Sequence, residues 1–122
     1  MGIDKHHELS VRTKKFALRI IKLSEALPRT RAANVISNQV LRSATSIAAN
    51  YRACGRARSK AEFIAKIGIV IEEADETVLW LELLIESEIV PAIRLERLIA
   101  EANQLLAIFS ASGRTAKNDR KS

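Results

Sequence analysis

The stretch RSATSIAANYRACGRARSKAEFIAKI, Arg42 to Ile67, joins two helical patterns through a basic break. Downstream of the break, Ser59 and Glu62 have the spacing of a capping box, in which a serine caps the start of a helix. The stretch therefore predicts helices over about residues 34–55 and 60–88, which meet at an arginine-rich corner near Gly55. Upstream of Gly55 the apolar residues recur on one helix face: Ile36, Val40, Ala44, Ile47, Tyr51 and Cys54.

The third of the predicted helices, over residues 60–88, is apolar across more than one stripe. Its core stripe is Phe63, Ile67, Val70, Ala74, Val78, Leu81 and Ile85. Seven further apolar residues widen it: Ile64, Ile69, Ile71, Leu79, Trp80, Leu83 and Leu84. We expect a second buried face and hence self-association, the alternative being one broad intramolecular face.

Two further helical patterns flank this pair, over about residues 8–27 and 91–112. Pro28 ends the first, Asn34 is a candidate N-cap for the second helix, and Gly113 is a plausible end of the fourth. No segment alternates like a strand, and the connections are short. The sequence thus predicts an all-α, up-down-up-down antiparallel four-helix bundle over residues 1–113, followed by a basic mobile tail over residues 114–122.

The length of 122 residues fits one domain with its own core. The single cysteine, Cys54, cannot form an intramolecular disulfide and ends an apolar stripe, so we expect it in the core. No apolar run has the length of about 18 residues that a membrane span needs, and the N-terminus is not organised as a signal peptide. We expect a cytoplasmic protein without a membrane partner.

Charge is distributed unevenly along the chain. Residues 1–60 carry 13 Lys and Arg against 3 Asp and Glu, whereas residues 61–113 carry 3 against 10. A basic half beside an acidic half either complements itself, within the fold or between subunits, or leaves a basic binding surface.

The acidic group Glu72, Glu73, Asp75 and Glu76 is the one candidate for metal chemistry. Ferritin-like bundles ligate iron with Glu-x-x-His motifs, but here His6 and His7 lie near the N-terminus, outside the predicted helices. We expect the acids to face solvent or to pair with arginines of the second helix, and expect no metal. No histidine activates Cys54 and no glycine loop cradles phosphates, so neither an enzyme nor a cofactor is expected.

A polar ridge, Ser43, Ser46 and Asn50 with Arg42 alongside, runs along the second helix. Facing the acidic third helix, it would form a hydrogen-bonded seam that fixes helix register, and we favour this structural role over a ligand site.

The remaining basic residues are candidates for nucleic-acid binding through phosphates rather than bases, since aromatic residues are few and lie on apolar faces. Antiparallel topology scatters these residues, but repetition around an oligomer would make even a modest patch multivalent. The candidates are Arg12, Lys14, Lys15, Arg19 and Lys22 on the first helix and Arg56, Arg58 and Lys60 at the corner.

The segment LRSATSIAANYRACGRARSKAEFIAKIGIVIEEADETVLWLELL, Leu41 to Leu84, resembles the four-helix-bundle proteins encoded in intervening sequences of bacterial 23S rRNA genes, and Leu27-Pro28 resembles their first connection. The resemblance implies a ring, commonly a homopentamer, without catalytic activity. Relatives that accompany the reverse transcriptases of diversity-generating retroelements bind nucleic acid and the polymerase. The resemblance implies an architectural role for the motif residues Arg42, Ser46, Asn50, Tyr51, Phe63, Glu73, Glu76 and Trp80.

Three function classes follow. The leading hypothesis is a non-enzymatic homo-oligomeric bundle that binds structured RNA or other nucleic acid through its basic residues. The alternative is a protein–protein interaction scaffold, for example a polymerase accessory protein, whose charges serve subunit assembly. The third, a metal-dependent enzyme using the acidic group, predicts bound transition metal in the purified protein.

Overall fold

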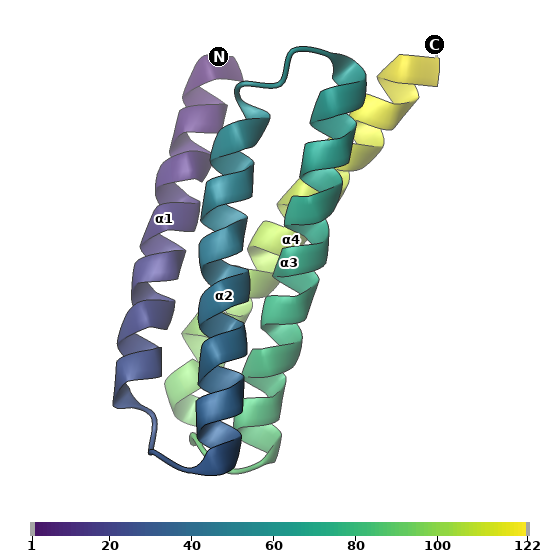
Figure 1. Ribbon diagram of the computed structural model, residues 1–122. Coiled ribbons are helices and arrows are strands. Elements are labelled where there is room, and N and C mark those ends of the chain that lie inside the picture. Colours follow the sequence, from purple (N-terminus) through teal and green to yellow (C-terminus); the bar gives the residue numbers. More distant parts are fainter. Residues whose placement is uncertain (1, 122) are drawn as a thin grey trace.

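The computed structural model describes residues 2–121, and the side chains of residues 5–119. The described part of the chain consists of four helices without a strand: α1 (Gly2–Ala26), α2 (Arg31–Cys54), α3 (Lys60–Glu86) and α4 (Ala92–Lys121). Consecutive helices run in opposite directions (Figure 1). This confirms the predicted all-α, up-down-up-down bundle. None of the described helices combines the length and the apolar character needed to cross a bilayer.

The four helices do not pack equally against one another. α2 packs against α1 and α3, and α3 against α2 and α4, whereas α1 and α4 make the sparsest contact. Figure 1 shows why: α4 runs obliquely behind α2 and ends beside α3, away from the start of α1. The α1–α4 seam is therefore the most open side of the bundle.

The first and last helices are longer than the sequence pattern predicted. α1 begins at Gly2 rather than near residue 8. α4 does not end near Gly113 but continues to Lys121, so the expected tail is, through Lys121, part of this helix. The extension has packing reasons: Ala116 is buried, and Lys60 Nζ lies 3.6 Å from Asp119 Oδ2.

The connections also correct two boundaries. Thr30, not Asn34, caps α2: its side chain accepts a hydrogen bond from the Ala33 N–H at 3.2 Å, so the helix starts three residues earlier than expected. α3 ends at Glu86 because Glu88 adopts a left-handed conformation, with φ of 62°, that reverses the chain towards α4.

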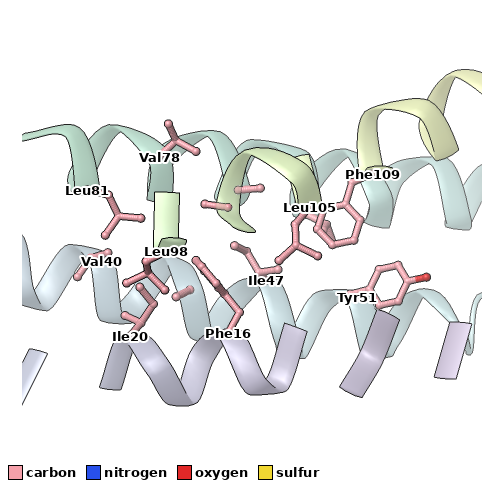
Figure 2. Packing of buried hydrophobic residues seen from close by; sticks show 14 of the residues in the cluster. Phe16, Ile20, Val40, Ile47, Tyr51, Val78, Leu81, Leu98, Leu105 and Phe109 are labelled. Carbon is pink, nitrogen blue, oxygen red and sulfur yellow. The ribbon is translucent and has the colours of Figure 1, made fainter. Parts of the chain in front are cut away.

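The core lies along the bundle axis and draws on all four helices. Figure 2 shows Phe16 and Ile20 of α1, Ile47 of α2 and Phe109 of α4 pointing into the same interior. Cys54 is buried, as expected. α3 needs a wide apolar face because it packs on both α2 and α4. This accounts for Leu84, which is buried, but not for all of the predicted width: Ile69 and Leu79 remain exposed.

The arginine-rich corner is built as the capping pattern predicted, with one addition. Ser59 Oγ accepts a hydrogen bond from the Glu62 N–H at 3.0 Å. Gly55 lies at the end of α2 because a Cβ there would come within 2.3 Å of His6 Nε2. His6 stacks on Tyr51 with ring centroids 4.8 Å apart. His6, which the sequence pattern placed outside the predicted helices, therefore lies within α1 and covers the end of α2.

Replacing Gly68 with alanine is expected to stabilise the protein by about 0.5–1 kcal/mol, because glycine is unfavourable inside a helix. A Cβ at Gly68 would meet no atom within 4 Å. Urea unfolding followed by circular dichroism measures the change. Gly113→Ala is the matched control: its Cβ would lie 3.3 Å from Ile71 Cδ1, so its gain should be smaller. A larger gain at Gly113 than at Gly68 would contradict this account.

Candidate nucleic-acid interface

Four of the predicted nucleic-acid-binding residues form one stripe along α1. Arg12, Lys15, Arg19 and Lys22 are spaced by three, four and three residues, the spacing of a single helix face. We call these four residues the basic stripe. Arg12 is bonded to α4, so the stripe borders the open α1–α4 seam, while the other three side chains are exposed.

Arg12 holds this seam together. Its Nε and Nη2 each donate to one carboxylate oxygen of Glu101, both at 2.8 Å, and Nη2 also donates to Gln104. The hydrogen bonds with Glu101 raise the pKa of Arg12. A two-point arginine–carboxylate pair fixes geometry as well as charge, so Arg12 positions the stripe and is not itself free for a phosphate.

Next to this pair lies an open, shallow groove between α1 and α4, with a volume of about 720 Å³. It is lined by Arg19, Arg97, Ala100, Glu101 and Gln104. Neither Arg19 nor Arg97 forms an ion pair with any carboxylate in the described part of the chain. Two unpaired guanidinium groups across one groove suit phosphate oxygens.

Sequence reasoning missed Arg97. It lies in the half of the chain with net negative charge, outside the runs of basic residues. Its only local signal is its place one turn before Glu101, the partner of Arg12. The pairing of α1 with α4 could not be read from sequence, and it is this pairing that brings Arg97 beside Arg19.

The other predicted basic residues lie elsewhere. Lys14 lies on a different face of α1 from the basic stripe. Arg56, Arg58 and Lys60 occupy the α2–α3 corner, at the end of the bundle where α1 begins, whereas Lys22 lies towards the opposite end (Figure 1). Arg58 and Lys60 lie within 4 Å of carboxylates, those of Glu62 and Asp119. The structure therefore does not join the corner to the groove.

Four of the motif residues form one bonded network at the α2–α3 seam: Arg42, Glu73, Glu76 and Trp80. Arg42 pairs with Glu73 Oε2 at 2.9 Å and with Glu76, which also accepts a hydrogen bond from Trp80 Nε1 at 3.2 Å. The expected pairing of the acidic group with an arginine of α2 is thus present. These contacts join α2 to α3, which favours an architectural role for Arg42.

The polar ridge is only partly as expected. Ser43 is buried and faces α3, where its Oγ lies 2.7 Å from Thr77 Oγ1. Asn50 instead donates to Ser46, to its backbone oxygen and to its Oγ, both at 2.9 Å, so these two residues bond along α2 and not across the seam. Tyr51 is buried in the core and Phe63 is half-buried beside it.

The Arg42 pair predicts a dependence of stability on pH. Its hydrogen bond lowers the pKa of the Glu76 carboxyl from the usual 4.5, so the folded state favours the ionised form. The resulting stabilisation is present above pH 4.5 and is lost as the pH falls through the lower folded-state value. We expect Arg42→Gln to destabilise the protein by about 1 kcal/mol or less at pH 7, the pair being largely exposed, and by less still at pH 3.

Urea unfolding at the two pH values measures this difference. The control is Arg52→Gln, an exposed arginine of α2 without an ion pair among the described residues. An Arg42→Gln effect that is as large at pH 3 as at pH 7 would show that Arg42 acts through packing and not through charge.

Among the described residues the acidic group is not part of a metal centre. No three His, Cys, Asp or Glu side chains among residues 5–119 lie close enough together to hold a metal ion. Burial raises the pKa of the Cys54 thiol, which disfavours the thiolate that a nucleophile needs.

Known proteins give this arrangement a family context. The family model described as 23S rRNA-intervening sequence protein matches residues 5–111. Comparison with curated proteins finds no match. The solved structures include a similar protein of unknown function from the S23 ribosomal protein family, from Bacteroides thetaiotaomicron VPI-5482. The two sequences are 36% identical, and the structures have a TM-score of 0.79. The match covers 85% of this chain and 96% of the other. The chain thus belongs to the family of 23S rRNA-intervening sequence proteins.

Proposed function

We propose that this protein is a non-enzymatic, cytoplasmic bundle that binds structured RNA or other nucleic acid at the α1–α4 groove. One observation carries the proposal: the exposed Lys15, Arg19 and Lys22 follow one stripe of α1, and Arg97 meets that stripe across the groove. A row of cations beside a groove can contact successive phosphates of a nucleic-acid backbone.

The binding is to backbone and shape, with little reading of bases. Base stacking needs exposed aromatic rings. Phe16, Tyr51 and Phe109 are buried in the core, and Trp80 is half-buried with its indole N–H bonded to Glu76. Among the described residues no exposed Phe, Tyr or Trp lies beside the basic stripe, so the proposed affinity is electrostatic and falls steeply with salt.

The protein is further proposed to act as a homo-oligomer. The family resemblance implies a ring, commonly of five subunits. A ring multiplies a patch of four cations into a multivalent surface, whose overall affinity exceeds that of a single groove. The ribosomal family name of the Bacteroides protein makes structured ribosomal RNA the first probe to use.

Fluorescence anisotropy tests the proposal. Labelled structured RNA, a scrambled RNA and duplex DNA are titrated with the protein at about 50 and 200 mM salt, the range over which phosphate contacts weaken by orders of magnitude. We expect binding that is strong at the lower salt and weak at the higher. Absence of binding to all three probes at the lower salt would overturn the proposal.

A protein-interaction scaffold, such as a polymerase accessory protein, is the second candidate. The observation that favours it is that Arg12, Arg42, Arg58 and Lys60 are already beside carboxylates of their own chain. If the remaining charges serve subunit assembly in the same way, high salt should split the oligomer, and nucleic acid should not bind at any salt.

A further inference from the structure

α1 carries a second periodic stripe that the core does not use. Val11, Lys14, Leu18 and Ile21 are spaced by three, four and three residues, on a different face from the basic stripe. Val11, Leu18 and Ile21 are all exposed, Leu18 to 54%. Phe16 and Ile20 already fill the core side of this helix. We call the second set the outer stripe of α1.

α3 carries a matching stripe on its own outer side. Ile69, Glu72, Glu76, Leu79 and Leu83 are spaced by three, four, three and four residues. Ile69 and Leu79 are exposed, Leu79 to 46%, and Leu83 is half-buried. This outer stripe of α3 is the part of the predicted apolar width that packing on α2 and α4 does not cover.

The two outer stripes have opposite charge. The chain from residue 67 to residue 93 contains no Lys or Arg, and the exposed Glu72, Asp75 and Glu82 make the surroundings of the stripe on α3 mainly acidic. Glu76 of this stripe is already paired with Arg42 of α2. The stripe on α1 contains Lys14 and lies beside Lys15 and Lys22, with Glu25 at its far end. Apolar positions between charges of opposite sign are the composition of two surfaces that fit each other.

The stripe on α1 is short enough to lie along the stripe on α3. At a rise of about 1.5 Å per residue, the stripe on α1 extends over about 15 Å and that on α3 over about 21 Å. Within one chain the two helices are not neighbours and make no contact among the described residues. The stripes can therefore meet only between two copies of the chain.

We propose that the outer stripe of α1 in one copy docks against the outer stripe of α3 in a second copy. This inference rests on the self-association within the proposed function, and it names the surfaces. Because the two surfaces differ, the contact is heterologous: one copy keeps its α3 stripe unused and the other keeps its α1 stripe, and repetition closes a ring or extends a filament. Arg19 of the basic stripe lines the α1–α4 groove, on another face of α1, and stays open to nucleic acid.

A mixing experiment tests this head-to-tail contact. Leu18→Glu disables the stripe on α1, and Leu79→Lys disables the stripe on α3. We expect wild-type protein to be oligomeric and each variant alone to be monomeric, with the chain mass of 13.5 kDa by light scattering or native mass spectrometry. An equimolar mixture should form a dimer of one chain of each, because each variant retains the stripe that the other lacks.

Controls separate this result from general loss of structure. Val35 on α2 and Ile93 on α4 are also exposed apolar residues but lie outside both stripes, so Val35→Glu and Ile93→Lys should stay oligomeric. Circular dichroism should show all four variants folded. A second pair, Ile21→Glu and Ile69→Lys, repeats the test at other exposed positions of the stripes.

Three results would overturn the proposal: a monomeric wild type, variants that remain oligomeric, or two monomeric variants that do not pair on mixing. The anisotropy assay on Leu18→Glu keeps the two proposals apart. If the variants pair on mixing but bind no RNA, the nucleic-acid role is wrong and the docking contact stands. If the variants assemble like the wild type and bind RNA in a salt-sensitive way, the docking contact is wrong and the nucleic-acid role stands.

Discussion

Replacing Lys15 and Arg19 together with glutamine is expected to weaken binding of structured RNA on the order of 100-fold at about 50 mM salt, and to lower the slope of log affinity against log salt by about two. Both side chains are exposed on the basic stripe, and Arg19 also lines the groove. Each releases counterions when it meets a phosphate, so losing two cations removes two such contributions. Anisotropy titrations at several salt concentrations give both quantities.

The matched control replaces Arg114 and Lys117 with glutamine. These are also one arginine and one lysine, both exposed, but they lie on the last part of α4, away from the groove residues. Net charge falls equally in both double variants, so an effect of overall charge would weaken both alike. If the control lost as much affinity as the groove variant, the α1–α4 groove would not be the binding site.

The fold followed from periodicity because each helix needs one apolar face and the connections carry recognisable signals. The stripe of α2 and the Ser59 cap required no knowledge of distant contacts. Helix ends were predicted less well where tertiary contacts decide them. α4 continues past Gly113 because its following turns pack on the bundle, where Ala116 is buried. Gly113 itself is buried, and a Cβ there would lie 3.3 Å from Ile71 Cδ1 of α3.

The candidate site could be predicted only in part, since it depends on which helices meet. The spacing of Arg12, Lys15, Arg19 and Lys22 is visible in the sequence. The sequence does not show that Arg12 pairs with Glu101, 89 positions away, or that Arg97 approaches the basic stripe. For the same reason the stack of His6 on Tyr51 was missed: residue types do not show that the start of α1 lies against the end of α2.

Phe109→Ala is expected to destabilise the protein by about 3–5 kcal/mol, a large part of the stability of a domain of this size. Phe109 is fully buried, and its ring lies 5.2 Å from that of Tyr51 (Figure 2). Removing the ring loses its burial and leaves a cavity beside Tyr51. Urea unfolding monitored by circular dichroism measures the loss.

The size of the effect should depend on the cavity and not on altered helix propensity, because alanine is the better helix former. Phe109→Leu fills most of the space and should cost less than about 1.5 kcal/mol. Tyr51 also supports the His6 ring, so the cavity variant should lose amide-exchange protection first in the opening turns of α1. Equal destabilisation by alanine and leucine would mean that the interior around Phe109 collapses to fill the gap, and that this end of the bundle is less tightly packed than its burial indicates.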